Sequence, residues 1–285
     1  MKSSRIVYLL VLVLFSDCKK VVSNMQNLSG GRVYIIGHEG SGELNNAYPP
    51  DSWEGVTRAV EYYNADGVEI DLQLSQDSVL FMFEGNSLEA STTCLGCLVS
   101  IDSLLLSKCI YQNTQTPGAI STKYITAFET VVARFSQRKI KPLIFMDLHT
   151  ATGCITNSME YSYYTNLVTA AEKILAAYDA YDWIYIQSYV PEWLAETVKQ
   201  YPKTRVMYDG TLADGDIEYA KNNGFYGIAS KNDNINAEQI TAAHTAGLRV
   251  QLYGADGQND MVDAFNKSPD YFLTDNIPLS ESILE

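Results

Sequence analysis

The sequence predicts a single-domain (β/α)8 barrel, a TIM-type barrel with a small insertion after its second strand. Three observations lead to this fold class. Short runs rich in β-branched and aromatic residues alternate with helical patterns along the chain, and eight such runs occur. Most of these runs end in polar residues. The length of 285 residues also suits one barrel of this kind.

The predicted elements follow one another in the order expected for a barrel. The strands are Val33–Ile36, Gly67–Leu72, Leu143–Asp147, Trp183–Gln187, Arg205–Tyr208, Tyr226–Ala229, Arg249–Tyr253 and Tyr271–Thr274. The helices are Trp53–Tyr63, Ala127–Gln137, Thr165–Tyr178, Glu192–Gln200, Asp216–Asn223, Ala237–Ala246 and Met261–Asn266. Thr126 and Glu129 match a capping box, and Pro191 suits a helix start. An open doubly wound sheet is the alternative, although no G-x-G-x-x-G motif joins a strand to a helix.

Residues 79–113 break this alternation. We expect an extra hairpin strand there and a cysteine-bearing insertion at about 84–120, within a barrel domain that spans residues 30–285. The domain contains four cysteines: Cys94, Cys97, Cys109 and Cys154. This even number permits disulfides in an oxidising compartment, by any of three pairings. Half of a zinc site at the C-x-x-C pair is the alternative, but no second Cys or His pair has zinc-like spacing.

Residues 1–22 have the pattern of a signal peptide or a lipoprotein signal. Basic residues precede the apolar run Ile6–Phe15, which is too short to span a bilayer. Cys18 follows this run as in a bacterial lipobox, and ordinary cleavage near Val21–Ser23 is the alternative. We therefore expect an exported protein that is periplasmic, secreted or lipid-anchored at the cell envelope.

The charge of the chain narrows the range of partners. Acidic residues outnumber basic ones by 34 to 20, which gives a formal net charge of −14. A strongly acidic protein repels a phosphate backbone, so we expect no nucleic-acid partner. No further apolar run approaches the length of a transmembrane helix, so membrane contact is expected only through a lipid anchor at Cys18.

Polar side chains gather where the predicted strands end, which is where the active sites of such barrels lie. They are His38, Glu69, Asp71, Asp147, His149, Gln187, Ser188, Tyr253 and Asp275. Glu69 and Asp71 are two residues apart on one strand, so both side chains point into the barrel. Adjacent buried carboxylates repel unless they are protonated or bound to a cation. Oxygen ligands from Glu69, Asp71 and Asp147 suit Mg²⁺ or Ca²⁺.

Several motifs resemble those of glycerophosphodiester phosphodiesterases. Residues 36–40 look like the family's H-R-G opening, and residues 49–52 stand where the family has P-E-N-[TS]. Residues 65–77 are similar to A-D-G-x-E-x-D-x-x-L-[TS]-x-D almost throughout, and residues 274–278 resemble the closing T-D-x-P. The resemblance runs from about Val33 to Pro278 and implies a (β/α)8 barrel with an insertion after strand 2.

The resemblance implies a metal-dependent hydrolase that acts on small glycerophosphodiester molecules of lipid head-group metabolism. Carried over by motif, Glu69, Asp71 and Asp147 would hold a divalent cation, Ca²⁺ or Mg²⁺. His38 would be the first catalytic acid-base group. Glu84 stands where the family has its second catalytic histidine, and it is our candidate for that role.

The chain departs from the family pattern at positions that would contact phosphate. The arginine of H-R-G is Glu39, the lysine of E-x-K is His149, and the arginine of L-x-R-x-T is Ala90. Glu39, His149 and Tyr253 are the predicted substrate contacts. Each carboxylate near the phosphodiester, Glu39 or Glu84, would repel it by roughly a kcal/mol.

Three functions are compatible with these departures. In the first, the protein hydrolyses phosphodiesters, with protonated Glu84 as the acid and an extra metal ion held by the surrounding carboxylates. These are Glu39, Glu69, Asp71, Glu84 and Asp147. In the second, it is a catalytically inactive relative that binds a ligand after export. In the third, a carboxylate pair beside Tyr253 cleaves glycosidic bonds, although no motif supports that chemistry.

Overall fold

The described part of the computed structural model comprises residues 25–42, 48–112, 123–148, 150 and 153–284. The predicted leader, with Cys18, lies outside the described residues, and so does His149. None of the helices in the described ranges is both long and apolar enough to cross a membrane.

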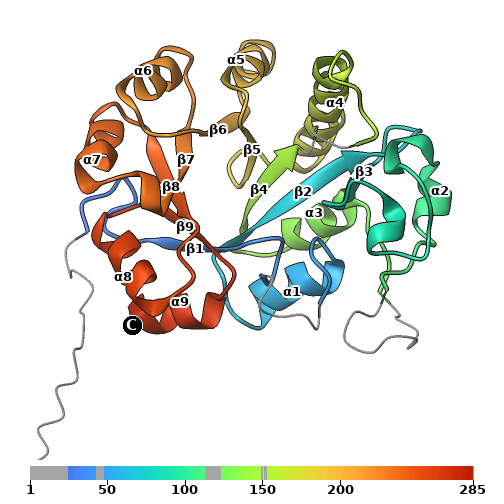
Figure 1. Cartoon of the computed structure of the whole chain (residues 1–285), viewed down its shortest axis with the longest axis horizontal. Helices are drawn as coiled ribbons and strands as arrows, with labels where there is room; N and C mark the ends of the chain where they lie inside the picture. The colour runs from blue at the N-terminus through green and yellow to red at the C-terminus, as the bar shows by residue number, and fades with distance from the viewer. Residues whose placement is uncertain (1–24, 43–47, 113–122, 149, 151–152, 285) are drawn as a thin grey trace, which may run out of the picture.

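Parallel strands form the centre of the molecule. They are β1 (Tyr34–Gly37), β2 (Gly67–Leu74), β4 (Leu143–Leu148), β5 (Ile184–Ser188), β6 (Arg205–Asp209), β7 (Gly227–Lys231), β8 (Arg249–Tyr253) and β9 (Tyr271–Thr274). β1 pairs with both β2 and β9, so the sheet closes into a ring. Figure 1 shows these strands enclosed by helices. The predicted (β/α)8 barrel is confirmed, and the open-sheet alternative is wrong because the ring closes.

Helices cover the outside of the barrel. They are α1 (Trp53–Glu61), α3 (Phe128–Ser136), α4 (Glu160–Tyr178), α5 (Pro191–Gln200), α6 (Asp214–Asn222), α7 (Ala237–Thr245), α8 (Gln258–Asn266) and α9 (Ile277–Leu284), with the short turn η3 (Asn232–Asn234) after β7. α9 was not predicted, and α4 begins before the predicted start at Thr165. Pro191 opens α5 as predicted. The capping box at Thr126 is wrong, because Ala127 is the N-cap and the Thr126 hydroxyl donates to the Tyr124 carbonyl.

Aromatic side chains fill the barrel interior below the carboxyl ends of the strands. Phe145 stacks on Tyr185 with ring centroids 4.8 Å apart and meets Tyr271 edge-on at 5.2 Å. The hydroxyl groups of Tyr226 and Tyr271 are hydrogen-bonded at 3.0 Å. These rings pack like a protein core, so the polar strand ends above them face only the loops.

Between β2 and β4 the chain forms the predicted insertion. It contains β3 (Leu80–Met82), which pairs antiparallel with the end of β2, followed by η1 (Leu88–Ala90), η2 (Leu98–Ser100) and α2 (Ser103–Leu106). Figure 1 shows it beside the carboxyl end of β2. Its own small core is buried: Phe81, Phe83, Leu88, Leu98, Leu106, Cys109, Tyr111 and Ile125. The insertion is therefore a packed layer at the rim of the barrel.

Two disulfides hold this layer. Cys94–Cys109 lies within the insertion, whereas Cys97–Cys154 joins the insertion to the segment between β4 and α4. The expected disulfides are confirmed. Of the three ways to pair four cysteines that the sequence left open, the structure shows this one. The zinc alternative is wrong, because both cysteines of the C-x-x-C pair are oxidised.

We expect the disulfide that joins the insertion to the barrel to contribute more stability than the other one. Its partners are separated by 57 residues and those of Cys94–Cys109 by 15, so it closes the longer loop in the unfolded chain. Chain entropy alone gives losses of about 4 and about 3 kcal/mol for Cys97→Ser/Cys154→Ser and Cys94→Ser/Cys109→Ser. Urea unfolding of both double variants measures this. Equal or reversed losses would contradict the ranking.

Candidate active site

The predicted metal ligands come together at the carboxyl ends of β2 and β4. These strands pair in parallel with Asp71 opposite Asp147, and Glu69 lies two residues before Asp71 on the same face of β2. Gly67 permits this close pairing, since a Cβ there would lie 2.3 Å from the Leu143 carbonyl oxygen. The strand register therefore brings carboxylates from distant parts of the sequence onto one rim.

Glu69, Asp71 and Asp147 form a triad that fits a divalent cation. One oxygen of each lies within 4.8 Å of the other two. Opposite oxygens around Ca²⁺, each 2.3–2.6 Å from the ion, are about 4.6–5.2 Å apart, and Mg²⁺ requires a slightly tighter arrangement. The triad is an all-oxygen site of the kind that both ions prefer.

Burial makes this triad unfavourable without a cation. Burial and the nearby charges of Glu69 and Asp209 raise the pKa of Asp147 to about 8, although His38 acts in the opposite direction. Burial and the charges of Glu69, Asp51 and Asp147 hold the pKa of Asp71 well above its usual range. Burial also raises the pKa of Glu69, and His38 partly offsets this. A bound cation would favour the ionised carboxylates instead.

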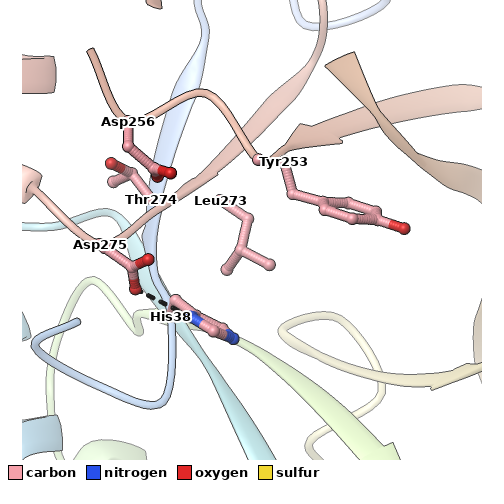
Figure 2. A pocket seen from close by; sticks show the side chains of 7 residues that line it. His38, Tyr253, Asp256, Leu273, Thr274 and Asp275 are labelled. Atoms are coloured by element: carbon pink, nitrogen blue, oxygen red, sulfur yellow. Dashed lines mark hydrogen bonds and ion pairs between the residues drawn. The ribbon is translucent and has the colours of Figure 1, made fainter. Parts of the chain in front are cut away.

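His38 lies directly after β1 and is oriented by Asp275, which follows β9. Nδ1 of His38 lies 2.8 Å from Oδ1 of Asp275, and Figure 2 shows this pair at the edge of a cavity. Burial lowers the pKa of His38, but the hydrogen bond to Asp275 and the charges of Glu69 and Glu39 outweigh burial and raise it to about 10. With Nδ1 held by Asp275, Nε2 is the ring atom left to exchange a proton with a substrate.

A second group of carboxylates adjoins the first. Glu39, Asp71 and Glu84 each offer an oxygen within 4.8 Å of the others. Glu39 is buried in the turn after β1, with a φ of 47°, and Nε2 of His38 lies 3.8 Å from its Oε1. Glu84 follows β3 and is exposed. The structure thus brings Glu84, the candidate acid, to the same rim as the metal triad.

Two of the three predicted substrate contacts, Glu39 and Tyr253, lie among the described residues. Glu39 is at the site, and Tyr253 lies at the end of β8, where its hydroxyl donates to Asp209 at 3.0 Å. His149 lies outside the described residues. A cavity of about 140 Å³ opens at the rim (Figure 2), lined by His38, Tyr253, Gly254, Asp256, Leu273, Thr274 and Asp275.

Sequence reasoning assigned no role to three acidic residues of this site. Asp275 was recognised only as a residue at a strand end, and its contact with His38 depends on the pairing of β1 with β9. Asp209 is the last residue of β6, and the predicted strand ended one residue earlier, at Tyr208. Asp51 is fully buried, and its Oδ1 accepts the Asp71 amide at 3.0 Å. The motif at residues 49–52, which contains Asp51, was the sequence feature that could have identified this residue.

The sequence model of the glycerophosphoryl diester phosphodiesterase family matches residues 44–279. No curated protein sequence matches the chain.

Solved structures with the same barrel share little sequence with this chain. A Silicibacter pomeroyi protein with a provisional assignment as a glycerophosphoryl diester phosphodiesterase has a TM-score of 0.75 and 15% identity, over 88% of this chain and 92% of its own. A glycerophosphodiester phosphodiesterase from Agrobacterium tumefaciens has a TM-score of 0.71 at 15% identity, with 88% and 100% covered. An Oleispira antarctica phosphodiesterase, solved with the product sn-glycerol-3-phosphate, has a TM-score of 0.72 at 15% identity, with 88% and 96% covered. At this identity these structures establish the fold.

We expect the metal-free protein to lose stability as the pH rises from about 5 to about 9. The pKa of Asp147 is raised from 3.8 to about 8, so the folded state binds its proton more tightly than the unfolded state does. The pKa of His38 is raised from 6.5 to about 10, and its contribution to stability is lost through that range. Both effects lower the free energy of unfolding with rising pH.

Thermal unfolding in a chelator, across this pH range, measures the effect. Millimolar Ca²⁺ should flatten the profile, since the ion binds the ionised carboxylates. Asp147→Asn should make it shallower without any ion, and the contribution of His38 should remain. A melting temperature that stays constant or rises with pH in the chelator would contradict the expectation.

Proposed function

Because the chain belongs to the glycerophosphoryl diester phosphodiesterase family, we propose that it is a metal-dependent hydrolase of small glycerophosphodiesters. The observation that carries this proposal is the placement of a cation-fitting triad and an oriented histidine on one rim. Glu69 belongs to the triad, and its charge also acts on His38. The two groups are therefore near enough to act on one phosphodiester.

The triad Glu69, Asp71 and Asp147 would hold Ca²⁺ or Mg²⁺, and the ion would act as a Lewis acid toward the phosphoryl oxygens. His38 exchanges the proton at Nε2, while Asp275 keeps the ring in one orientation through Nδ1. Hydrolysis breaks the bond between phosphorus and the alcohol oxygen. The phosphorus gains the oxygen of water, and the alcohol leaves with a proton.

A structural neighbour supports this substrate class. The Oleispira antarctica phosphodiesterase was solved with sn-glycerol-3-phosphate, which is its product. We propose that this chain releases glycerol phosphate of the same kind, with a small alcohol as the second product. The role of Glu84 as the second acid-base group stays a prediction.

The competing function is that of an inactive, ligand-binding relative. Two observations favour it. Glu84 stands where the family has its second catalytic histidine, and among the described residues His38 is the histidine that lies at the rim. A test of turnover separates the two functions.

We also propose that the protein is exported. The pattern of residues 1–22 supports this location, and so do the two disulfides, which form and persist in oxidising compartments. The choice between a cleaved signal peptide and a lipid anchor at Cys18 belongs to the same proposal.

We expect the purified protein to hydrolyse glycerophosphodiesters when Ca²⁺, Mg²⁺ or Mn²⁺ is present and to stop when a chelator is added. His38→Ala should lower kcat by about 10²–10⁴-fold, because it removes the proton-transfer group. Asp147→Asn should remove most of the activity and raise the ion concentration that the remaining activity requires, because one of the three ligands is lost. Release of glycerol phosphate, measured by a coupled assay, reports turnover.

Glu218→Gln is the matched control, since Glu218 is exposed on α6 and away from the rim. It should retain the activity of the unmodified protein. If the folded protein shows no turnover with any of the three ions, the hydrolase proposal is wrong and the inactive relative remains.

A further inference from the structure

Glu39, Asp71 and Glu84 are held in place by the barrel. The Phe83 amide donates to the Asp71 carbonyl at 3.0 Å, which fixes the chain entering Glu84 against β2. The Gln73 side chain, also in β2, donates to the carbonyls of Phe83 and Gly85 at 3.0 and 2.9 Å. The backbone on both sides of Glu84 is therefore anchored to one buried amide, although the Glu84 side chain is exposed.

Glu39 is anchored from the other direction. Its carbonyl accepts the Asp51 amide at 3.1 Å, and its own amide donates to Oε2 of Glu69 at 3.2 Å. The carboxyl groups of Glu39, Asp71 and Glu84 thus approach within 4.8 Å from three separate segments. Asp71 lies on β2, and the segments that carry Glu39 and Glu84 are both hydrogen-bonded to this strand.

Asp51 provides an independent sign that this place takes a ligand. Its side chain is 0% exposed, and Oδ1 accepts the Asp71 amide, but Oδ2 has no hydrogen-bond partner in the described structure. After burial, the charges of Glu39, Glu69 and Glu84 are the main causes that raise its pKa, so its carboxyl group lies near these side chains. A buried oxygen without a partner destabilises the folded protein, and more strongly if it is charged.

The insertion contributes a second buried polar atom beside Asp51. The Tyr111 hydroxyl has no hydrogen-bond partner among the described residues, and Asp51 and Glu39 are among the charges that raise its pKa after burial. Asp51 Oδ2 and the Tyr111 hydroxyl are thus two buried polar atoms that have no hydrogen-bond partner in the described structure. An ion with its water molecules would satisfy both.

We propose that Glu39, Asp71 and Glu84, with Asp51 beside them, form a second divalent-cation site. It shares Asp71 with the triad Glu69, Asp71 and Asp147, so the protein holds two ions bridged by one carboxylate. Paired ions in two-metal sites lie about 3.5–4 Å apart, which one shared carboxylate can span. This inference deepens the proposed function and rests on it for the first ion.

The second ion explains how a phosphodiester approaches so acidic a rim. The two triads and Asp51 alone bring six carboxyl groups to it: Glu39, Asp51, Glu69, Asp71, Glu84 and Asp147. His38 is the cationic side chain that acts on Glu69 and Asp147. Two divalent ions would supply the positive charge that the sequence lacks at its phosphate-contacting positions. Glu84 then acts as a metal ligand rather than as the general acid.

Ion stoichiometry tests this site without relying on activity. Metal-free protein is titrated with Ca²⁺ in a calorimeter, and a parallel titration with Mn²⁺ is followed by electron paramagnetic resonance. The unmodified protein should bind two ions, and two Mn²⁺ ions that share Asp71 should give an exchange-coupled spectrum. Glu84→Gln and Asp51→Asn should each bind one ion, or the second at least about tenfold more weakly, and lose the coupled signal.

Glu218→Gln is the control here too, because it removes an exposed carboxylate of α6 that belongs to neither triad, and it should keep two ions and the coupled signal. Circular dichroism of each metal-free variant checks folding. If Glu84→Gln proves unfolded, Glu39→Gln takes its place with the same expected loss.

One ion in the unmodified protein, or two ions retained in the folded Glu84→Gln variant, would overturn the second site. These outcomes are separate from a failure of the proposed function. Two bound ions without turnover would support the second site and contradict the proposed hydrolase. Turnover with one bound ion would support the hydrolase and contradict the second site.

Discussion

Mutual repulsion among buried carboxylates is the constraint on which the site depends. The register of β2 with β4 places Asp71 opposite Asp147, and the alternation along β2 adds Glu69 on the same face. The aromatic layer around Phe145 and Tyr185 closes the barrel below them, so water reaches these groups only from the loop side. Ionised carboxylates can persist there only with a cation close by. His38 is one such cation, and the metal ion that we propose would be the other.

Much of the fold and part of the site could be predicted from the sequence, for physical reasons. Buried parallel strands require short apolar runs, and these located the strands of the barrel. Glu69 and Asp71 were recognisable because a period of two places both on one face. The role of Asp275 depends on pairing between β1 and β9, which are far apart in sequence. Asp209 was missed because the predicted strand ended one residue early, and strand ends are the least certain part of such a prediction.

A disulfide joins the insertion to the segment that follows β4. Cys97–Cys154 connects it to the segment after β4, the strand that carries Asp147. Local patterns left the cysteine pairing open, because spacing along the chain does not tell which thiols meet in space. The packed side chains of the insertion, among them Phe81 and Phe83, lie next to the backbone that carries Glu84.

Gln73 donates hydrogen bonds to the carbonyls on either side of Glu84. The position of the Glu84 backbone therefore depends on β2 and not on the outer part of the insertion. Because the anchor is a barrel strand, the segment beyond Gly85 could change in length or composition while Glu84 kept its place. Such modularity lets natural variation, or a protein engineer, exchange the outer loops while the acidic rim is retained.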